Sequence, residues 1–217
     1  AGEDRIYEAL EDVKLNPPEK YIDQVPQQLS GGEKQRVSIA RGLILEPDVI
    51  LADEPVSMLD VSTQAAILED LADITDNRDV SMFYISHDLS TVSYICDQVN
   101  VMYLGRFVES APTRELLSSP KHPYTQALIN AIPIPDPHYN RERTSMQGTP
   151  SDPVNLPTGC RFKDRCPERM DICDVTPRYL DTAEGEQEHF VSCHLYYDHE
   201  STVNKAETKK SVTTKND

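Results

Sequence analysis

Two neighbouring acids, Asp53 and Glu54, follow a short apolar run in the first half of the sequence. The run, residues 49–52, is typical of a strand buried on both faces of a parallel sheet. Because open α/β sheets bind ligands at the carboxyl ends of their strands, two carboxylates there can hold Mg²⁺ and accept a proton from an attacking water. The plainer alternative is an acidic pair that only ends the strand, and taken alone the pair favours that alternative.

A serine and two glycines open the helical pattern before this run. Ser30 and Glu33 have the spacing of a capping box, so we expect Ser30 to be the N-cap of the next helix. A helix start presents unpaired N–H groups and a partial positive charge, and Gly31 and Gly32 let a ligand come close to the backbone. The sequence predicts either an anion-binding helix start or an ordinary capped helix after a glycine turn.

A histidine stands at a comparable place after a second apolar run. Residues 82–85 read as another strand, and His87 follows two residues later, so we expect its imidazole at the carboxyl edge of the same sheet. A helix-capping or core histidine is the alternative, and without the other motifs it would be the better interpretation.

Four motifs, in this order and spacing, resemble those of the ABC-transporter ATPases. They are LSGGEKQR (29–36), ILADEP (50–55), SMLD (57–60) and ISHD (85–88), which correspond to the signature loop, the Walker B strand, the D-loop and the switch histidine of that family. The resemblance implies an α/β fold of the P-loop NTPase kind, a layered, mostly parallel sheet with helices, with ATP and Mg²⁺ as ligands. Strands that alternate with helices along the sequence agree with that fold class.

The resemblance also implies a role for the residues of the signature loop and D-loop. Ser30, Gly31, Gly32 and Glu33 would form a nucleotide-binding signature in which Ser30 and Gly32 contact the γ-phosphate of an ATP held by a facing subunit. Asp60 resembles the D-loop acid that links the two nucleotide sites. These residues would therefore complete a site that belongs to another ATPase subunit.

The remaining matched residues would act on this subunit's own nucleotide. Asp53 resembles the acid on the Mg²⁺ side, Glu54 the general base and His87 the histidine that contacts the γ-phosphate and helps to position water. Phosphoryl transfer needs positioned charge and an oriented water more than covalent chemistry, so these residue types suit the reaction.

A phosphate-gripping loop is not found in the sequence. No G-x-x-x-x-G-K-[ST] string occurs, and the only adjacent glycines are those of the signature loop. We therefore interpret the chain as the C-terminal part of an ABC ATPase and expect that by itself it neither binds ATP tightly nor turns it over.

The string HPYTQALINAIPIPDP, which begins at His122, narrows the family. Its composition alone predicts only a short helix and a stiff proline-rich linker. It resembles the C-terminal extension of ATPases from oligopeptide and dipeptide permeases, which also serve some nickel importers. The resemblance implies an ATP-hydrolysing subunit that energises peptide import and lies at the cytoplasmic face of the cell membrane. Its partners would be a second ATPase subunit, identical or related, the permease subunits and, indirectly, a solute-binding protein.

Four cysteines gather after this string, at Cys160, Cys166, Cys173 and Cys193. Four thiols in one segment suggest a metal site, and both iron–sulfur clusters and structural zinc take four thiolates. The usual zinc spacing of two to four residues within a pair is not met. The peptide-permease extension contains this cysteine pattern, and the resemblance implies a 4Fe-4S cluster, with zinc and unligated thiols as the alternatives.

Composition limits the other functions. The chain has 37 acidic and 21 basic residues, a formal charge of -16, so a nucleic-acid partner is not expected. Such a charge adds self-repulsion, which salt-adapted proteins exploit, although an ordinary acidic protein is the simpler explanation. Two rival functions remain at this stage, an ABC ATPase of DNA repair or chromosome maintenance and a non-catalytic partner module.

The elements expected around these motifs complete the interpretation. We expect an ATPase part over residues 1–117, a cysteine-containing extension over 118–198 and a disordered tail over 199–217, because the tail has almost no apolar residue. Further predicted elements are helices at 5–15, 62–74, 89–96, 112–117 and 126–131 and a hairpin of strands 101–103 and 106–108.

Overall fold

The computed structural model describes residues 2–132, 154–182 and 188–197. The chain forms two compact units, Ala1–Cys96 and Asp97–Asp217, and each is described by itself. The tail predicted over 199–217 lies outside the described residues. Among the described residues, no helix is both long enough and apolar enough to span a membrane.

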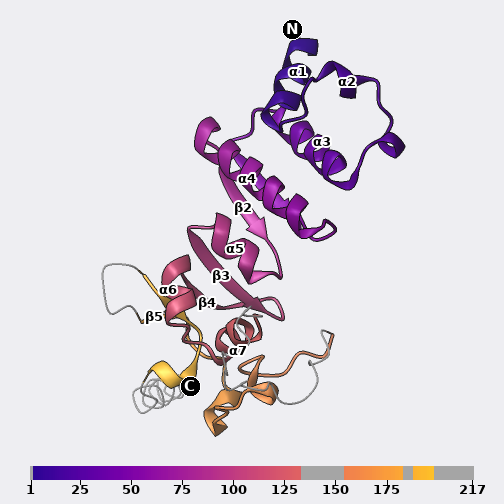
Figure 1. Ribbon diagram of the computed structural model, residues 1–217. Helices are drawn as coiled ribbons and strands as arrows, with labels where there is room; N and C mark the ends of the chain where they lie inside the picture. Colours follow the sequence, from indigo (N-terminus) through magenta and orange to yellow (C-terminus); the bar gives the residue numbers. More distant parts are fainter. Residues whose placement is uncertain (1, 133–153, 183–187, 198–217) are drawn as a thin grey trace, which may run out of the picture. The chain divides into compact units, whose positions relative to one another are not determined.

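Five α-helices and two strands are described in the first unit (Figure 1). In chain order they are α1 (Gly2–Asp12), α2 (Glu19–Ile22), α3 (Gly31–Leu43), β1 (Val49–Asp53), α4 (Val61–Arg78), β2 (Ser81–Ile85) and α5 (Leu89–Ile95). A short 3₁₀ turn, Pro26–Gln28, precedes α3. Each predicted helix and strand of this region is present, with ends that differ by a few residues.

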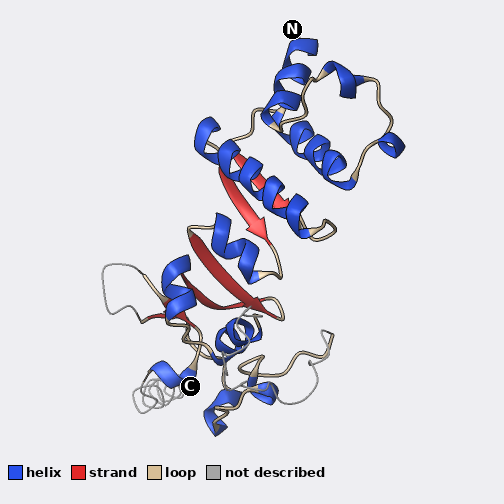
Figure 2. Cartoon of the chain, viewed as in Figure 1, coloured by secondary structure: helices blue, strands red, loops and turns tan. Residues whose placement is uncertain are grey.

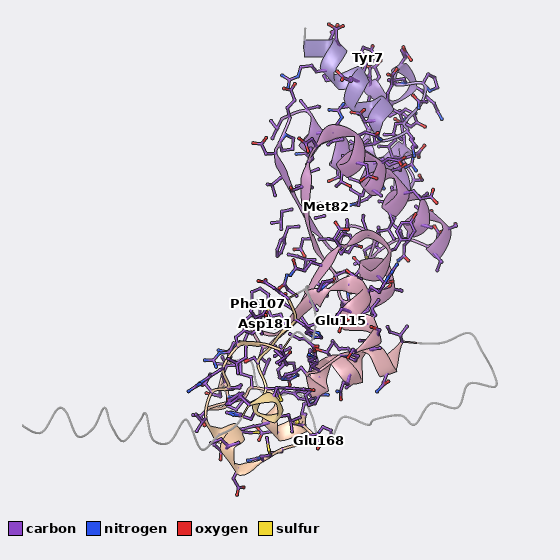
Figure 3. All side chains as sticks on the ribbon, turned by 90° about the vertical axis from the view of Figure 1, so that its left-hand side faces the viewer. Tyr7, Met82, Phe107, Glu115, Glu168 and Asp181 are labelled. Carbon is purple, nitrogen blue, oxygen red and sulfur yellow. The ribbon has the colours of Figure 1, made fainter. Side chains whose placement is uncertain are left out.

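The two strands pair in parallel, with Asp53 opposite Ile85 at their carboxyl ends. Helix α4 runs along this pair (Figure 2) and buries Ile67 and Leu71 in a cluster to which Met82, labelled in Figure 3, adds a side chain of β2. A second cluster packs α1 against α3. These contacts fix the strands, and hence their carboxyl ends, on one layer of helices.

The prediction that β1 is buried on both faces is wrong for the structure described. Leu51 is 67% exposed and Phe83, on the neighbouring strand, is 52% exposed. Their neighbours along the strands, such as Ala52 and Met82, turn toward the helices. The apolar run is a strand, as predicted, but its side chains alternate between faces and only one face is covered by described residues.

The second unit is built on a four-stranded antiparallel sheet with the order β3-β4-β6-β5. Its elements are β3 (Gln98–Tyr103), β4 (Arg106–Pro112), α6 (Thr113–Ser118), α7 (Pro123–Ala131), β5 (Leu180–Asp181) and β6 (Phe190–Val191). The predicted hairpin is confirmed, but the expectation of a mostly parallel sheet is not. Parallel pairing among the described strands is confined to β1 and β2.

An aromatic cluster forms the core of the second unit. The Phe162 ring, almost fully buried, lies 5.2 Å from the Tyr103 ring and 5.3 Å from the Tyr124 ring, measured between centroids. His122 adds a fourth ring at 5.9 Å. Since Tyr124 belongs to α7 and Phe162 follows the first of the four cysteines, the cluster fastens the cysteine segment to the sheet.

Candidate functional site

Glu54 and His87 meet at the carboxyl ends of β1 and β2. The Glu54 N–H donates to the Ile85 carbonyl at 2.9 Å, which continues the parallel ladder by one residue. Glu54 Oε1 then lies 2.7 Å from His87 Nδ1 and accepts the His87 backbone N–H at 3.2 Å. The predicted acid and histidine are thus in direct contact, although 33 residues separate them in the sequence.

The electrostatics of this contact favour a charged imidazole. The hydrogen bond and the negative charge of Glu54 raise the pKa of His87 above its ordinary value of 6.5. Glu54 itself has a φ of 48°, a left-handed conformation that is uncommon for residues other than glycine and often marks functional sites. The backbone there turns sharply so that the carboxylate faces the histidine of the next strand.

Asp53 ends β1 with an exposed side chain. It stands next to Glu54 and opposite Ile85 in the parallel register. A carboxylate at this position has the oxygen ligands that Mg²⁺ prefers, and it lies at the sheet edge where ligands bind in such folds. The three residues predicted for this subunit's own site therefore occupy one edge.

The signature loop begins α3 with the predicted capping box. The Ser30 N–H donates to a Glu33 carboxylate oxygen at 2.8 Å, and the Glu33 N–H donates to Ser30 Oγ at 3.3 Å. The hydrogen bond from the Ser30 N–H is the main reason that the pKa of Glu33 is lowered. The helix start is therefore rigid, with Ser30 fixed in its N-cap conformation.

The two glycines have a packing role that the sequence did not reveal. A Cβ on Gly32 would lie 2.6 Å from the Thr63 side chain, and one on Gly31 would lie 3.3 Å from the Leu59 side chain. The sequence predicts that the glycines admit a ligand; in the structure they also let the start of α3 approach the D-loop and the start of α4. The small size of Gly32 is required by this contact whether or not a ligand binds, whereas Gly31 is only tightly packed.

Asp60 caps α4 in the same neighbourhood. Its carboxylate accepts hydrogen bonds from the Thr63 N–H at 3.1 Å, Thr63 Oγ1 at 2.8 Å and Ser62 Oγ at 2.6 Å. These bonds, that from Ser62 first, lower the pKa of Asp60 to about 2. Thr63 thus bonds to Asp60 and lies close to Gly32. Among residues 2–96, no hydrogen bond or ion pair joins this group to the Glu54–His87 pair.

The four late cysteines are neighbours in the second unit. The pKa of Cys166 is raised to about 11 and that of Cys193 to about 12, mainly by burial and in smaller part by the other thiols of the set. The Cys160 N–H donates to the Cys173 carbonyl at 2.9 Å. Gly159, with a φ of 76°, makes this crossing possible, because a Cβ there would lie 2.3 Å from the Cys173 carbonyl oxygen.

Backbone N–H groups point at these sulfurs. The Met170 N–H donates to Cys173 Sγ at 3.4 Å, and hydrogen bonds from backbone N–H groups lower the pKa values of Cys160, Cys166 and Cys193 against the larger effect of burial. Within the part of the chain that the structure describes, no three histidine, cysteine or acidic residues form a group that could hold one metal ion.

A buried polar network in the second unit was missed at the sequence level. The fully buried Glu109 carboxylate of β4 accepts the Lys121 N–H at 2.6 Å and the His122 N–H at 2.9 Å, and Nε2 of the equally buried His189 lies 2.7 Å from it. His122 Nδ1 in turn accepts the Tyr124 N–H at 3.0 Å and so caps α7. No spacing in the sequence signals these contacts, since 80 residues separate Glu109 from His189.

Two family profiles match the chain. One is described as ABC transporter and matches residues 1–57. The other is described as Oligopeptide/dipeptide transporter, C-terminal region, and matches residues 108–173. The first match contains the signature loop and the Walker B acids; the second contains the HPYT string and three of the four cysteines.

Curated relatives agree with both profiles. A Brucella ovis protein named as a candidate peptide import ATP-binding protein is 47% identical over 191 residues, which is 88% of this chain and 59% of that protein. The dipeptide transport ATP-binding protein of Haemophilus influenzae is 43% identical over 178 residues, 82% of this chain and 54% of that protein. The oligopeptide transport ATP-binding protein AppF of Bacillus subtilis is 41% identical over 196 residues, 89% of this chain and 58% of that protein. The chain thus spans less than two thirds of the length of these relatives.

Proposed function

The chain belongs to the ATP-binding subunits of the peptide-type ABC transporters, and from that premise we propose that it supplies the part of an ATPase that triggers hydrolysis during import of di- or oligopeptides. The observation that carries this proposal is the 2.7 Å contact between Glu54 and His87 at the carboxyl edge of two parallel strands. The relatives named for peptide transport support it over the DNA-maintenance alternative.

Glu54 is the proposed general base. Its carboxylate would take a proton from the water that attacks the γ-phosphate, while His87 holds the carboxylate in place through two hydrogen bonds and contributes positive charge. Asp53, exposed at the end of β1, would hold Mg²⁺, which neutralises phosphate charge when bound. These residues would act on the nucleotide bound by this subunit.

The start of α3 and its neighbour Asp60 would act on a second nucleotide. Ser30, Gly31, Gly32 and Glu33 form a helix start whose N–H groups and partial positive charge suit a phosphate. This group has no hydrogen bond or ion pair to the Glu54–His87 pair within residues 2–96, which supports its assignment to an ATP held by a partner ATPase. The complex would also contain permease subunits and receive solute from a binding protein, with this subunit at the cytoplasmic face of the membrane.

A pair of variants tests the proposal in the assembled transporter. Glu54→Gln keeps the size of the side chain and removes the base, so ATP turnover should fall by about 10²–10⁴-fold while ATP still binds. Glu69→Gln, an exposed position on α4, is the matched control and should leave turnover unchanged. Turnover that persists in Glu54→Gln would contradict the assignment of Glu54.

We also propose that the four cysteines hold a 4Fe-4S cluster rather than zinc. The thiols are neighbours and several accept backbone N–H hydrogen bonds, an arrangement that suits cluster sulfurs. The gaps between these cysteines do not match the spacing of two to four residues within a pair that is usual for structural zinc. Iron and sulfide analysis after anaerobic purification decides the matter: a colourless protein without iron would refute the cluster.

A further inference from the structure

Asp70 is a buried acid of the first unit that the proposed chemistry does not use. It lies on α4 and is only 1% exposed, whereas aspartate is almost never fully buried unless paired. A buried carboxylate is costly unless opposite charges compensate it. We therefore asked which groups face it and what they hold in place.

Two cations from two other segments face this carboxylate. Arg36 of α3 places Nη2 2.7 Å from Asp70 Oδ2, a charge contact without hydrogen-bond alignment. Lys14, in the turn after α1, places Nζ 3.1 Å from Asp70 Oδ1. Lys14 also pairs with Asp73, one turn further along α4, at 2.6 Å, but Asp73 is 56% exposed and, among the described residues, has no ion pair with Arg36.

Arg36 uses its other nitrogen to hold the end of α1. Nη1 donates to the Val13 carbonyl at 3.0 Å and more weakly to the Lys14 carbonyl at 3.4 Å. The Arg36 guanidinium thus links the turn after α1 to Asp70 of α4. We call this link between Arg36 and Asp70 the tie. A planar guanidinium suits this task because its donors have a fixed geometry, which a lysine cannot reproduce.

The position of this tie relative to the helix starts matters. Arg36 lies six residues after Ser30 and Asp70 lies ten residues after Asp60, so the tie sits about 9 Å from the start of α3 and about 15 Å from the start of α4 along their axes. The starts themselves touch where Gly31 and Gly32 approach Leu59 and Thr63. Two separate contact points fix both the angle and the axial offset of two helices.

We propose that Asp70 and Arg36 are positioning residues that hold the signature loop and the D-loop in one fixed arrangement, so that Ser30, Gly32 and Asp60 reach the partner's nucleotide together. This inference rests on the proposed function. Among residues 2–96, the tie has no hydrogen bond or ion pair to Ser30 or Asp60, so it acts through the placement of α3 and α4. Because Gly31 and Gly32 pack closely against Leu59 and Thr63, loss of the tie should displace α3 and α4 as whole helices.

The test uses ATP turnover by the assembled transporter and thermal unfolding of the same subunit. Asp70→Asn leaves Arg36 without its counter-charge and should lower both the unfolding midpoint and turnover, the latter by roughly 10²-fold, as expected when catalytic groups are misplaced by about 1 Å. Asp73→Asn, on the same helix and against the same Lys14, is the control and should stay within about twofold of wild type.

A double variant separates positioning from mere stability. Arg36→Met with Asp70→Leu removes both charges, and replacing a buried ion pair by apolar residues usually leaves stability unchanged or improves it. We expect the unfolding midpoint to recover while turnover stays low. Recovery of turnover to within about twofold of wild type would overturn the proposal, because stability alone would then explain the single variant.

A third variant covers the case in which the double variant does not fold. Arg36→Lys keeps the charge facing Asp70 but cannot also hold the Val13 carbonyl, so a folded Arg36→Lys subunit should still lose most of its turnover. Full turnover in this variant would overturn the proposal. A wild-type transporter without ATP turnover would instead refute the proposed function itself, which keeps the two failures distinguishable.

Discussion

His87 binds one carboxylate oxygen of Glu54 through both its backbone N–H and its ring. This double contact favours the protonated form of His87, because the Glu54 carboxylate stabilises the imidazolium. The folded-state pKa of His87 is therefore raised above 6.5. The contact contributes stability below pH 6.5, and that contribution is lost as the pH rises through the raised pKa.

A titration by NMR tests this pair without ATP or a partner. In the 217-residue chain, Glu54→Gln should bring the pKa of His87 down toward its ordinary value, since the hydrogen bond and charge of Glu54 are the largest causes of the shift. Asp88→Asn is the control: Asp88 is a minor cause of the shift and asparagine still caps α5. Equal pKa values in wild type and Glu54→Gln would show that the contact is not formed in solution.

His122 should show the opposite pH dependence. Burial lowers its pKa to about 4, below the 6.5 of an exposed histidine. The unfolded chain therefore takes up the proton first, and stability falls as the pH drops from 6.5 toward 4. His122→Asn keeps an acceptor for the Tyr124 N–H and removes the titration, so the second unit should keep about 2 kcal/mol at pH 5 that wild type loses relative to pH 7. Urea unfolding at the two pH values measures the difference, and parallel losses in both proteins would contradict it.

The positions of helices and strands were predicted well where a signal in the neighbouring sequence sets them. They were predicted less well where contacts with residues distant in the sequence set them. The capping box correctly placed the start of α3. Helix α7 was expected to begin at residue 126 but begins at Pro123, because His122 serves as its cap and proline occupies its first turn. Histidine is not a usual cap, and its role depends on burial beside Glu109. The local sequence also could not predict which face of β1 is covered, because a continuous apolar run places apolar side chains on both faces of the strand.

The one-sided burial of β1 predicts different consequences for two leucines. Leu71→Ala in α4 removes a side chain that is 1% exposed and should cost about 2–5 kcal/mol of unfolding free energy. Leu51→Ala in β1 removes one that is largely exposed and should change it by about 0.5 kcal/mol or less in this chain. Urea unfolding of the two variants makes the comparison. A similar loss in both would mean that the exposed face of the strand pair is covered in solution.

At the scale of the whole molecule, the sequence motifs led to the family, and the profiles and relatives bear that out. They did not reveal the antiparallel sheet of the second unit. Strands β5 and β6 are only two residues long, too short to show alternation of apolar and polar residues. Strand β6 pairs with β4, about 80 residues earlier in the chain, and β5 pairs with β6. The contact between Glu109 of β4 and His189, the residue before β6, was missed for the same reason.

The formal charge of -16 is a property of the whole chain and gives a prediction at that scale. Self-repulsion among exposed acids destabilises the folded state, so added KCl should raise the unfolding temperature. Screening shortens the Debye length from about 10 Å at 0.1 M to about 3 Å at 1 M, so a gain from screening alone should level off within the first few tenths molar. A chain adapted to salt should continue to gain toward molar KCl. Thermal unfolding followed by circular dichroism from low to molar KCl distinguishes these outcomes: a plateau indicates an ordinary acidic protein, and no gain at any concentration would show that its acids are already balanced by their neighbours, as Asp70 is by Arg36 and Lys14.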